Sequence, residues 1–196
     1  MQDAFVGNWA RESHLSAEIL GSLHDLNHRF LDLVAARPEW PAGQVAPLSS
    51  VQRAAAAVCP YALFDLRFHD EGHWRPRLQD PGTWCVADEP PVYDATVSFV
   101  RLVLFYAWHV ASSASLKAQL LLGMNANTAA AFGRLTVNQL PMLAVTEAVH
   151  LSARWSGCTA YWSALTAAAA GGDPEALRRA QLRGLQLAAA ARLPDP

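Results

Sequence analysis

The chain has few cysteines, and the three it has lie far apart. Cys59, Cys85 and Cys158 form no CxxC pair and no even set that would suggest a disulfide framework. The first residues lack the charged and apolar regions of a secretory signal peptide. The most apolar run, residues 97–111, contains two ionisable side chains and is shorter than a bilayer-spanning helix. These absences predict a cytoplasmic protein that does not cross a membrane.

The chain also carries little charge and a single lysine. Only 16% of its residues are charged and 52% are hydrophobic, which is typical of a folded chain and excludes a disordered one. Its 196 residues are enough to bury a core without metals or disulfides. Residues 1–92 hold seven basic and twelve acidic side chains, whereas residues 93–196 hold eight basic and five acidic ones. A basic second half is compatible with nucleic-acid binding, but this excess is too small to indicate it alone.

Recognisable catalytic motifs are missing as well. The sequence contains no nucleophile elbow, P-loop, dinucleotide-binding glycine pattern or HExxH. Its neighbouring acids lie in expected loops, where adjacency does not place two carboxylates across a substrate. We therefore expect neither an enzyme nor a cofactor, although an active site can also be assembled from residues far apart in a sequence.

Helical patterns fill most of the chain, because alanine and leucine dominate and apolar residues recur with a period near 3.6. Expected capping residues include Asp94, Asp173, and Thr136 paired with Gln139. Short strands are possible only at Tyr61–Phe68 and His150–Trp155. The predicted fold class is all-α and multi-helical, with short helix-turn-helix-like segments in the second half. The expected helices cover residues 15–36, 50–58, 94–111, 115–123, 127–133, from 136 onward, 157–170 and 174–192.

A proline-rich stretch separates the two halves of the chain. Pro76–Pro91 holds four prolines among turn-forming residues, and Phe68–Trp74 before it has the composition of a polar turn. The sequence therefore predicts two domains. A helical N-terminal region of unknown role, residues 1–92, would end in a long proline-rich loop, and a helical domain would follow over residues 93–196.

Polar side chains gather around the short helices of the second half. Asn and Gln can read adenine edges, and Arg can bind guanine or phosphate. A helix-turn-helix around Gly123 or Gly133 would place its second helix in the major groove of DNA. The alternative is that these residues are caps and loop residues, since turns attract Asn and Thr. The candidates for DNA contact are Lys117, Asn125, Asn127, Thr128, Arg134, Asn138, Gln139 and Arg154.

The candidates for metal ligands are Cys59, His69, His73 and Cys85. His69 and His73 are four residues apart and would share one face of a helix, and zinc accepts two cysteines with two histidines. The long gaps and the missing CxxC argue against such a site. We therefore expect no bound metal. His24 and His28 have the same spacing, but such a pair is more typical of the solvated face of an amphipathic helix.

Four short motifs occur in a distinctive order within residues 100–156. They are Leu122-Gly123-Met124, Leu135-Thr136-Val137-Asn138-Gln139, Leu143-Ala144-Val145-Thr146 and Arg154-Trp155. This order resembles the FlhD family, the D subunits of the flagellar master transcriptional activator, over residues 100–156 only. From the resemblance we expect residues 93–196 to form an FlhD-like helical domain. The resemblance implies a helical, dimer-forming, DNA-binding activator subunit that acts in a hetero-oligomer with a zinc-containing C subunit. Residues 1–92 have no counterpart in that family.

Three hypotheses follow from the sequence. The first is an FlhD-like transcriptional regulator subunit that acts on DNA in a complex with a C-subunit-like protein, as a homodimer or hetero-oligomer. The second is a helical protein–protein interaction subunit that does not contact DNA. The third is an uncharacterised metal-binding protein or enzyme that uses the Cys59–Cys85 region.

Overall fold

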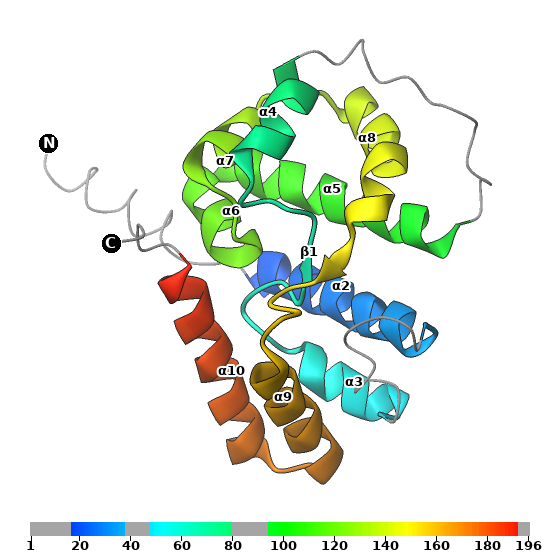
Figure 1. Ribbon diagram of the computed structural model, residues 1–196, viewed down its shortest axis with the longest axis vertical. Helices are drawn as coiled ribbons and strands as arrows, with labels where there is room; N and C mark the ends of the chain where they lie inside the picture. Colours follow the sequence, from blue (N-terminus) through cyan, green and yellow to red (C-terminus); the bar gives the residue numbers. More distant parts are fainter. Residues whose placement is uncertain (1–16, 38–47, 80–93, 192–196) are drawn as a thin grey trace, which may run out of the picture.

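The computed structural model describes residues 17–37, 48–79 and 94–191, and Figure 1 shows their arrangement. Within these residues 75% are helical and 3% are in strands, so the predicted all-α class is confirmed. The elements in chain order are α2 (Ala17–Ala35), α3 (Ser50–Ala57), β1 (Phe64–Asp65), α4 (Glu71–Gln79), α5 (Ala95–Ser113), α6 (Ser115–Leu122), α7 (Ala126–Phe132), the short 3-10 helix η3 (Val137–Gln139), α8 (Leu140–Glu147), the 3-10 helix η4 (Ala148–His150), β2 (Ser152–Ala153), α9 (Thr159–Gly171) and α10 (Pro174–Ala190).

Helix α5 is the centre of the upper part of the molecule in Figure 1, where α6, α7 and α8 pack against it and α2 packs on it from the lower part. Its buried residues include Val100, Val103, Leu104 and Ala107, a spacing of three and four that keeps one face in the core. In the described part of the chain α5 alone is long and apolar enough to cross a membrane, and 56% of its most apolar window is buried. A helix surrounded by other helices needs the same apolar composition.

The two halves of the chain share one core. Strand β1 pairs antiparallel with β2, with Phe64 opposite Ala153, and the Arg154 N–H donates to the Leu63 carbonyl at 2.9 Å. The pair confirms the two segments that the sequence marked as possible short strands. One cluster of buried side chains includes residues on both sides of residue 92. The predicted boundary itself, and residues 80–91 of the proline-rich loop, lie outside the described residues.

Helix α4 runs through a region where the sequence predicts a polar turn and then an irregular connection. Proline disfavours a helix interior, yet Pro76 lies inside α4. The reason is the burial of Trp74, which is fully enclosed and stacks on Phe68 with 5.8 Å between ring centroids. The Trp74 indole N–H also lies 3.2 Å and 3.1 Å from the carbonyl oxygens of Leu66 and Arg67, which hold it in place. Tertiary packing here outweighs local propensity.

Most of the expected helix caps are confirmed. The side chains of Asp94 and Asp173 accept hydrogen bonds from backbone N–H groups in the first turns of α5 and α10. The Gln139 side chain accepts from the Thr136 N–H at 2.7 Å. Helix α7 begins at Ala126, one residue before the predicted range of 127–133, because Asn125 caps it.

Candidate nucleic-acid interface

Helices α6 and α7 are joined by a turn of three residues and rest on α5. Gly123 ends α6 in the left-handed conformation, with a φ of 74°, which glycine adopts without strain. Short helices joined by a glycine-containing turn of this length are typical of a helix-turn-helix. The two helices and the turn bury Ala118, Leu121, Leu122, Met124, Ala129 and Phe132. The two short helices and the glycine turn that the sequence predicted here are therefore present.

Arg154 lies inside the fold beneath this turn and not on the surface expected of a DNA contact. It is only 8% exposed, donates from Nη1 to the Leu121 carbonyl at 3.2 Å, and lies over the Trp155 ring at 4.6 Å. A Cβ atom at Gly123 would lie 2.5 Å from an Arg154 guanidinium nitrogen. Arg154 thus holds the end of α6, and sequence reasoning missed this because a buried arginine and a surface one look alike in a sequence.

Three other candidates fill capping or core positions. The Asn125 side chain accepts from the Thr128 N–H at 2.7 Å and donates to the His69 carbonyl at 3.1 Å, which ties the turn to the first half of the chain. Thr128 is 2% exposed. The Gln139 side-chain oxygen accepts hydrogen bonds from the backbone N–H and the hydroxyl of Thr136. These positions agree with the alternative interpretation that they are caps and loop residues.

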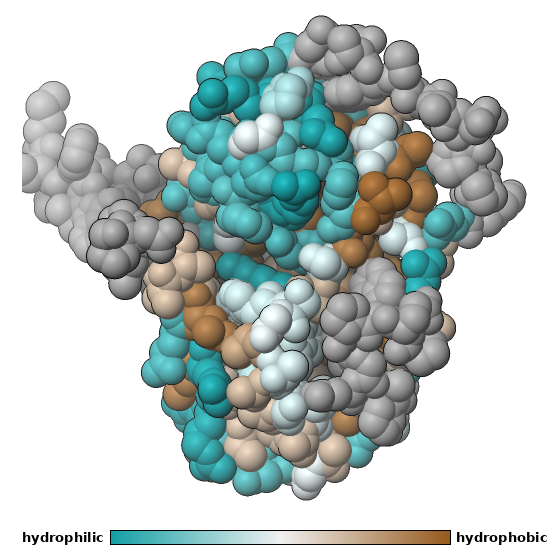
Figure 2. Space-filling view, viewed as in Figure 1, coloured by the Kyte–Doolittle hydropathy of each residue, from teal (hydrophilic) through white to brown (hydrophobic). Residues whose placement is uncertain are grey.

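The exposed candidates are Asn127, Arg134 and Asn138, whereas Lys117 on α6 is half-buried. A groove of about 590 Å³ between α4 and the α7 side of the molecule has Asn127, Arg134 and Gln139 in its lining. Figure 2 shows a mostly hydrophilic surface over the part where Figure 1 places α4 and α7. The groove thus combines basic and amide side chains with apolar ones, among them Leu78 and Leu135.

One acid also lines this groove. Glu71 on α4 accepts a hydrogen bond from the Asn127 side chain at 2.9 Å and forms an ion pair with Arg75. The Asn127 hydrogen bond, and then the Arg75 guanidinium, hold the pKa of Glu71 below its usual range. Glu71 is therefore charged at neutral pH, and it occupies the amide with which Asn127 would contact a base.

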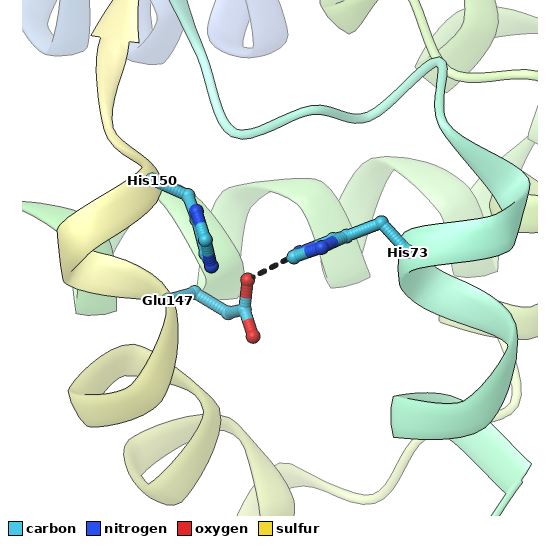
Figure 3. Close-up of side chains that lie close together, drawn as sticks. All are labelled: His73, Glu147 and His150. Carbon is cyan, nitrogen blue, oxygen red and sulfur yellow. Dashed lines mark hydrogen bonds and ion pairs between the residues drawn. The ribbon is translucent and has the colours of Figure 1, made fainter.

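A second polar group lies between α4 and the ends of α8 and η4 (Figure 3). The Glu147 carboxylate is fully buried, with Oε2 at 2.6 Å from His73 Nε2 and Oε1 at 2.6 Å from Arg77 Nε. The His150 ring meets the His73 ring edge to face, with 4.7 Å between centroids. Burial lowers the pKa of His150. In the described residues, His73, Glu147 and His150 form the group whose donor atoms are close enough to share a metal ion, all within 4.8 Å of one another.

The four metal ligands proposed from the sequence do not come together in this group. His73 alone belongs to it. The Cys59 thiol is buried, donates to the Ala56 carbonyl at 3.3 Å, and has its pKa raised by burial to about 12. The His69 side chain is largely exposed at the surface, and Cys85 lies outside the described residues. The sequence does carry one signal for the observed group, the Glu-x-x-His spacing of Glu147 and His150.

Comparisons with protein-family models, with curated proteins and with solved structures give no match. Two features of the described residues point to a function: the exposed side of the α6–α7 segment with its groove, and the buried group around Glu147.

Proposed function

We propose that the chain is a DNA-binding subunit of a transcriptional regulator that places α7 in the major groove. The observation that carries the proposal is the α6–Gly123–α7 arrangement, packed on α5 with Asn127 exposed on α7 and Arg134 exposed just beyond it. In a helix-turn-helix, the second helix is the one whose side chains reach base edges. The resemblance of residues 100–156 to FlhD subunits is consistent with this role.

Binding by one chain alone should be weak. The basic side chains in the groove beside α7 are Arg75 and Arg134, and Arg75 is already paired with Glu71. Such a surface neutralises few phosphates, and phosphate contacts supply most of the non-specific affinity for DNA. A second subunit would add contacts and raise the effective concentration, so specific binding needs a complex. We expect this complex to include a partner comparable to the C subunit.

Two variants that should change DNA affinity in opposite directions test the proposal. Arg134→Ala removes a positive charge beside α7, so we expect weaker DNA binding and a salt slope flatter by about one. Glu71→Gln removes a negative charge from the groove and weakens the hydrogen bond that holds the Asn127 amide, so we expect tighter binding. The matched control is Arg178→Ala, an exposed arginine on α10, which Figure 1 places away from α7.

The measurement is the fluorescence anisotropy of a labelled random-sequence duplex at several salt concentrations, with a thermal melt of each variant. The proposal predicts that DNA affinity is lowest for Arg134→Ala, intermediate for the parent and highest for Glu71→Gln. The control variant should bind as the parent does. If the parent shows no salt-dependent binding, or if all four proteins bind alike, α7 is not a DNA-binding helix.

A second candidate function has its own observation. Leu116 and Leu120 lie one turn apart on α6, and they are 62% and 45% exposed. This apolar strip favours a helical interaction subunit that pairs through α6 with a second copy of the chain, because a two-fold dimer joins the same patch on both protomers. Sedimentation velocity of the parent and of the Leu116→Ser/Leu120→Ser variant tests it. Concentration-dependent association that the variant loses supports this candidate, and a parent that stays monomeric excludes it.

A further inference from the structure

Three potential metal ligands come together behind α4 from distant parts of the sequence. His73 lies on α4, Glu147 ends α8, and His150 ends η4 one turn later (Figure 3). Glu147 and His150 are three residues apart, so a helical backbone presents both on one side. We infer that His73, Glu147 and His150 form a binding site for a divalent transition metal of the zinc class. The site is independent of the proposed DNA-binding role.

The donor set fits this class of ion. Two imidazole nitrogens and one carboxylate oxygen are the protein ligands of many catalytic zinc sites, which keep a fourth position for water, and of non-haem iron sites. Metal–ligand bonds near 2.1 Å place tetrahedral donor atoms about 3.4 Å apart. The donor atoms of the three residues lie between 2.6 Å and 4.8 Å apart, a range that includes that spacing. His150 is half-buried and gives an ion access from the surface.

Arg77 holds the carboxylate in the orientation that a metal needs. Its Nε donates to Glu147 Oε1 at 2.6 Å and its Nη1 donates to the His73 carbonyl at 2.8 Å. Oε1 is thereby occupied, while Oε2 faces the histidines. Outer hydrogen bonds of this kind orient ligands in metal sites. Arg77 also offsets the charge of Glu147, so affinity should be lower than in a site of four cysteine thiolates.

Metal binding also requires ligand atoms that carry no proton, so protons compete with the ion for the imidazole nitrogens. The hydrogen bond between His73 Nε2 and Glu147 Oε2 must open to admit the ion, and its proton then moves to Nδ1 of the ring or to solvent. Metal affinity should consequently fall as the pH is lowered.

The experiment uses the full-length protein after treatment with a chelator. Titration with Zn²⁺ by calorimetry and with Co²⁺ by visible absorption should show one strong site per chain, with the d–d bands of four- or five-coordinate cobalt. The key variant is His150→Ala, because a half-buried position tolerates truncation. The matched control is His69→Ala, a largely exposed histidine just before α4 that belongs to no such group.

We expect His150→Ala to weaken metal binding at least tenfold and His69→Ala to leave it unchanged. Glu147→Gln keeps the shape of the side chain but removes its charge, so it should also lose the metal, with circular dichroism reporting on its fold. Binding of Zn²⁺ by the parent only at the level of His150→Ala, or equal loss in His69→Ala, would overturn the inference. In that case the hydrogen bond between His73 and Glu147 serves only to join α4 to α8.

Discussion

Gly184 lies in the interior of α10, and a methyl group there should destabilise the protein. In an open helix, replacing glycine with alanine stabilises by about 1 kcal/mol, because glycine loses more backbone entropy on folding. At Gly184, however, a Cβ atom would lie 1.9 Å from the Tyr61 hydroxyl oxygen and 2.2 Å from its Cζ atom. We therefore expect Gly184→Ala to have the opposite sign from the helix-propensity rule.

The magnitude depends on whether Tyr61 can move. Its ring is fully buried and packs edge to face against Trp155 with 5.4 Å between centroids. Its hydroxyl donates to the Gln181 carbonyl at 3.1 Å and lies 3.2 Å from the Tyr161 hydroxyl. Overpacking of a well-filled core costs about 1–3 kcal/mol, and a lost hydrogen bond costs about 1 kcal/mol more. After the propensity gain of about 1 kcal/mol, net destabilisation of roughly 1–3 kcal/mol remains.

Urea denaturation followed by circular dichroism measures this difference, and Gly21→Ala is the matched control. Gly21 also lies inside a helix, α2, but nothing is within 4 Å of its added Cβ atom, so this variant should be stabilised by about 0.5–1 kcal/mol. If Gly184→Ala is stabilised as much as Gly21→Ala, then α10 does not pack as closely on the Tyr61 ring as described.

Three further predictions concern buried polar groups. Asn27→Ala should lower the free energy of unfolding by about 2–4 kcal/mol. The fully buried Asn27 amide accepts from the Leu63 N–H at 2.8 Å and donates to two backbone carbonyls, and all three bonds would be lost. A loss under about 1 kcal/mol by urea denaturation would contradict this. Alkylation followed by peptide mass spectrometry at pH 8 should label Cys158 faster than Cys59, whose pKa is raised by burial to about 12; the reverse order would refute this packing. In metal-free protein, NMR should give His150 a titration midpoint below 6.5. On acidification the unfolded state therefore takes up a proton at this histidine before the folded state does, so His150 should lower the free energy of unfolding as the pH falls below about 6.5. A midpoint above 6.5 would contradict this prediction.

The features that could be predicted from the sequence depend on contacts within a few residues. Asp94 and Asp173 cap helices because their carboxylates reach N–H groups only two residues away. The left-handed turn at Gly123 follows from the only residue type that adopts it without strain. Even the strand pair was visible as two short segments, although nothing in the sequence indicated that they pair with each other.

The features that could not be predicted depend on contacts across the chain. His73 and Glu147 are 74 residues apart, and neither is unusual in its local sequence. Helix α4 forms despite Pro76 because Trp74 finds a pocket made by segments distant in the sequence, including Phe132 on α7 at 4.8 Å between ring centroids. For the same reason Arg154 was predicted to be a surface residue. Its side chain is in fact buried at the end of α6, where it donates to the carbonyl of Leu121, 33 residues earlier in the chain.

Helix α4 separates the two proposed sites, and this allows each to be tested without disturbing the other. Residues two apart on a helix point in nearly opposite directions. Accordingly Glu71 reaches Asn127 on α7, whereas His73 reaches Glu147 at the end of α8. Glu71→Gln should therefore change DNA affinity without changing metal affinity, and His150→Ala should do the reverse. If instead each variant changes both affinities, the two sites are coupled, and α4, the element that supplies a side chain to each of them, is where the coupling must be sought.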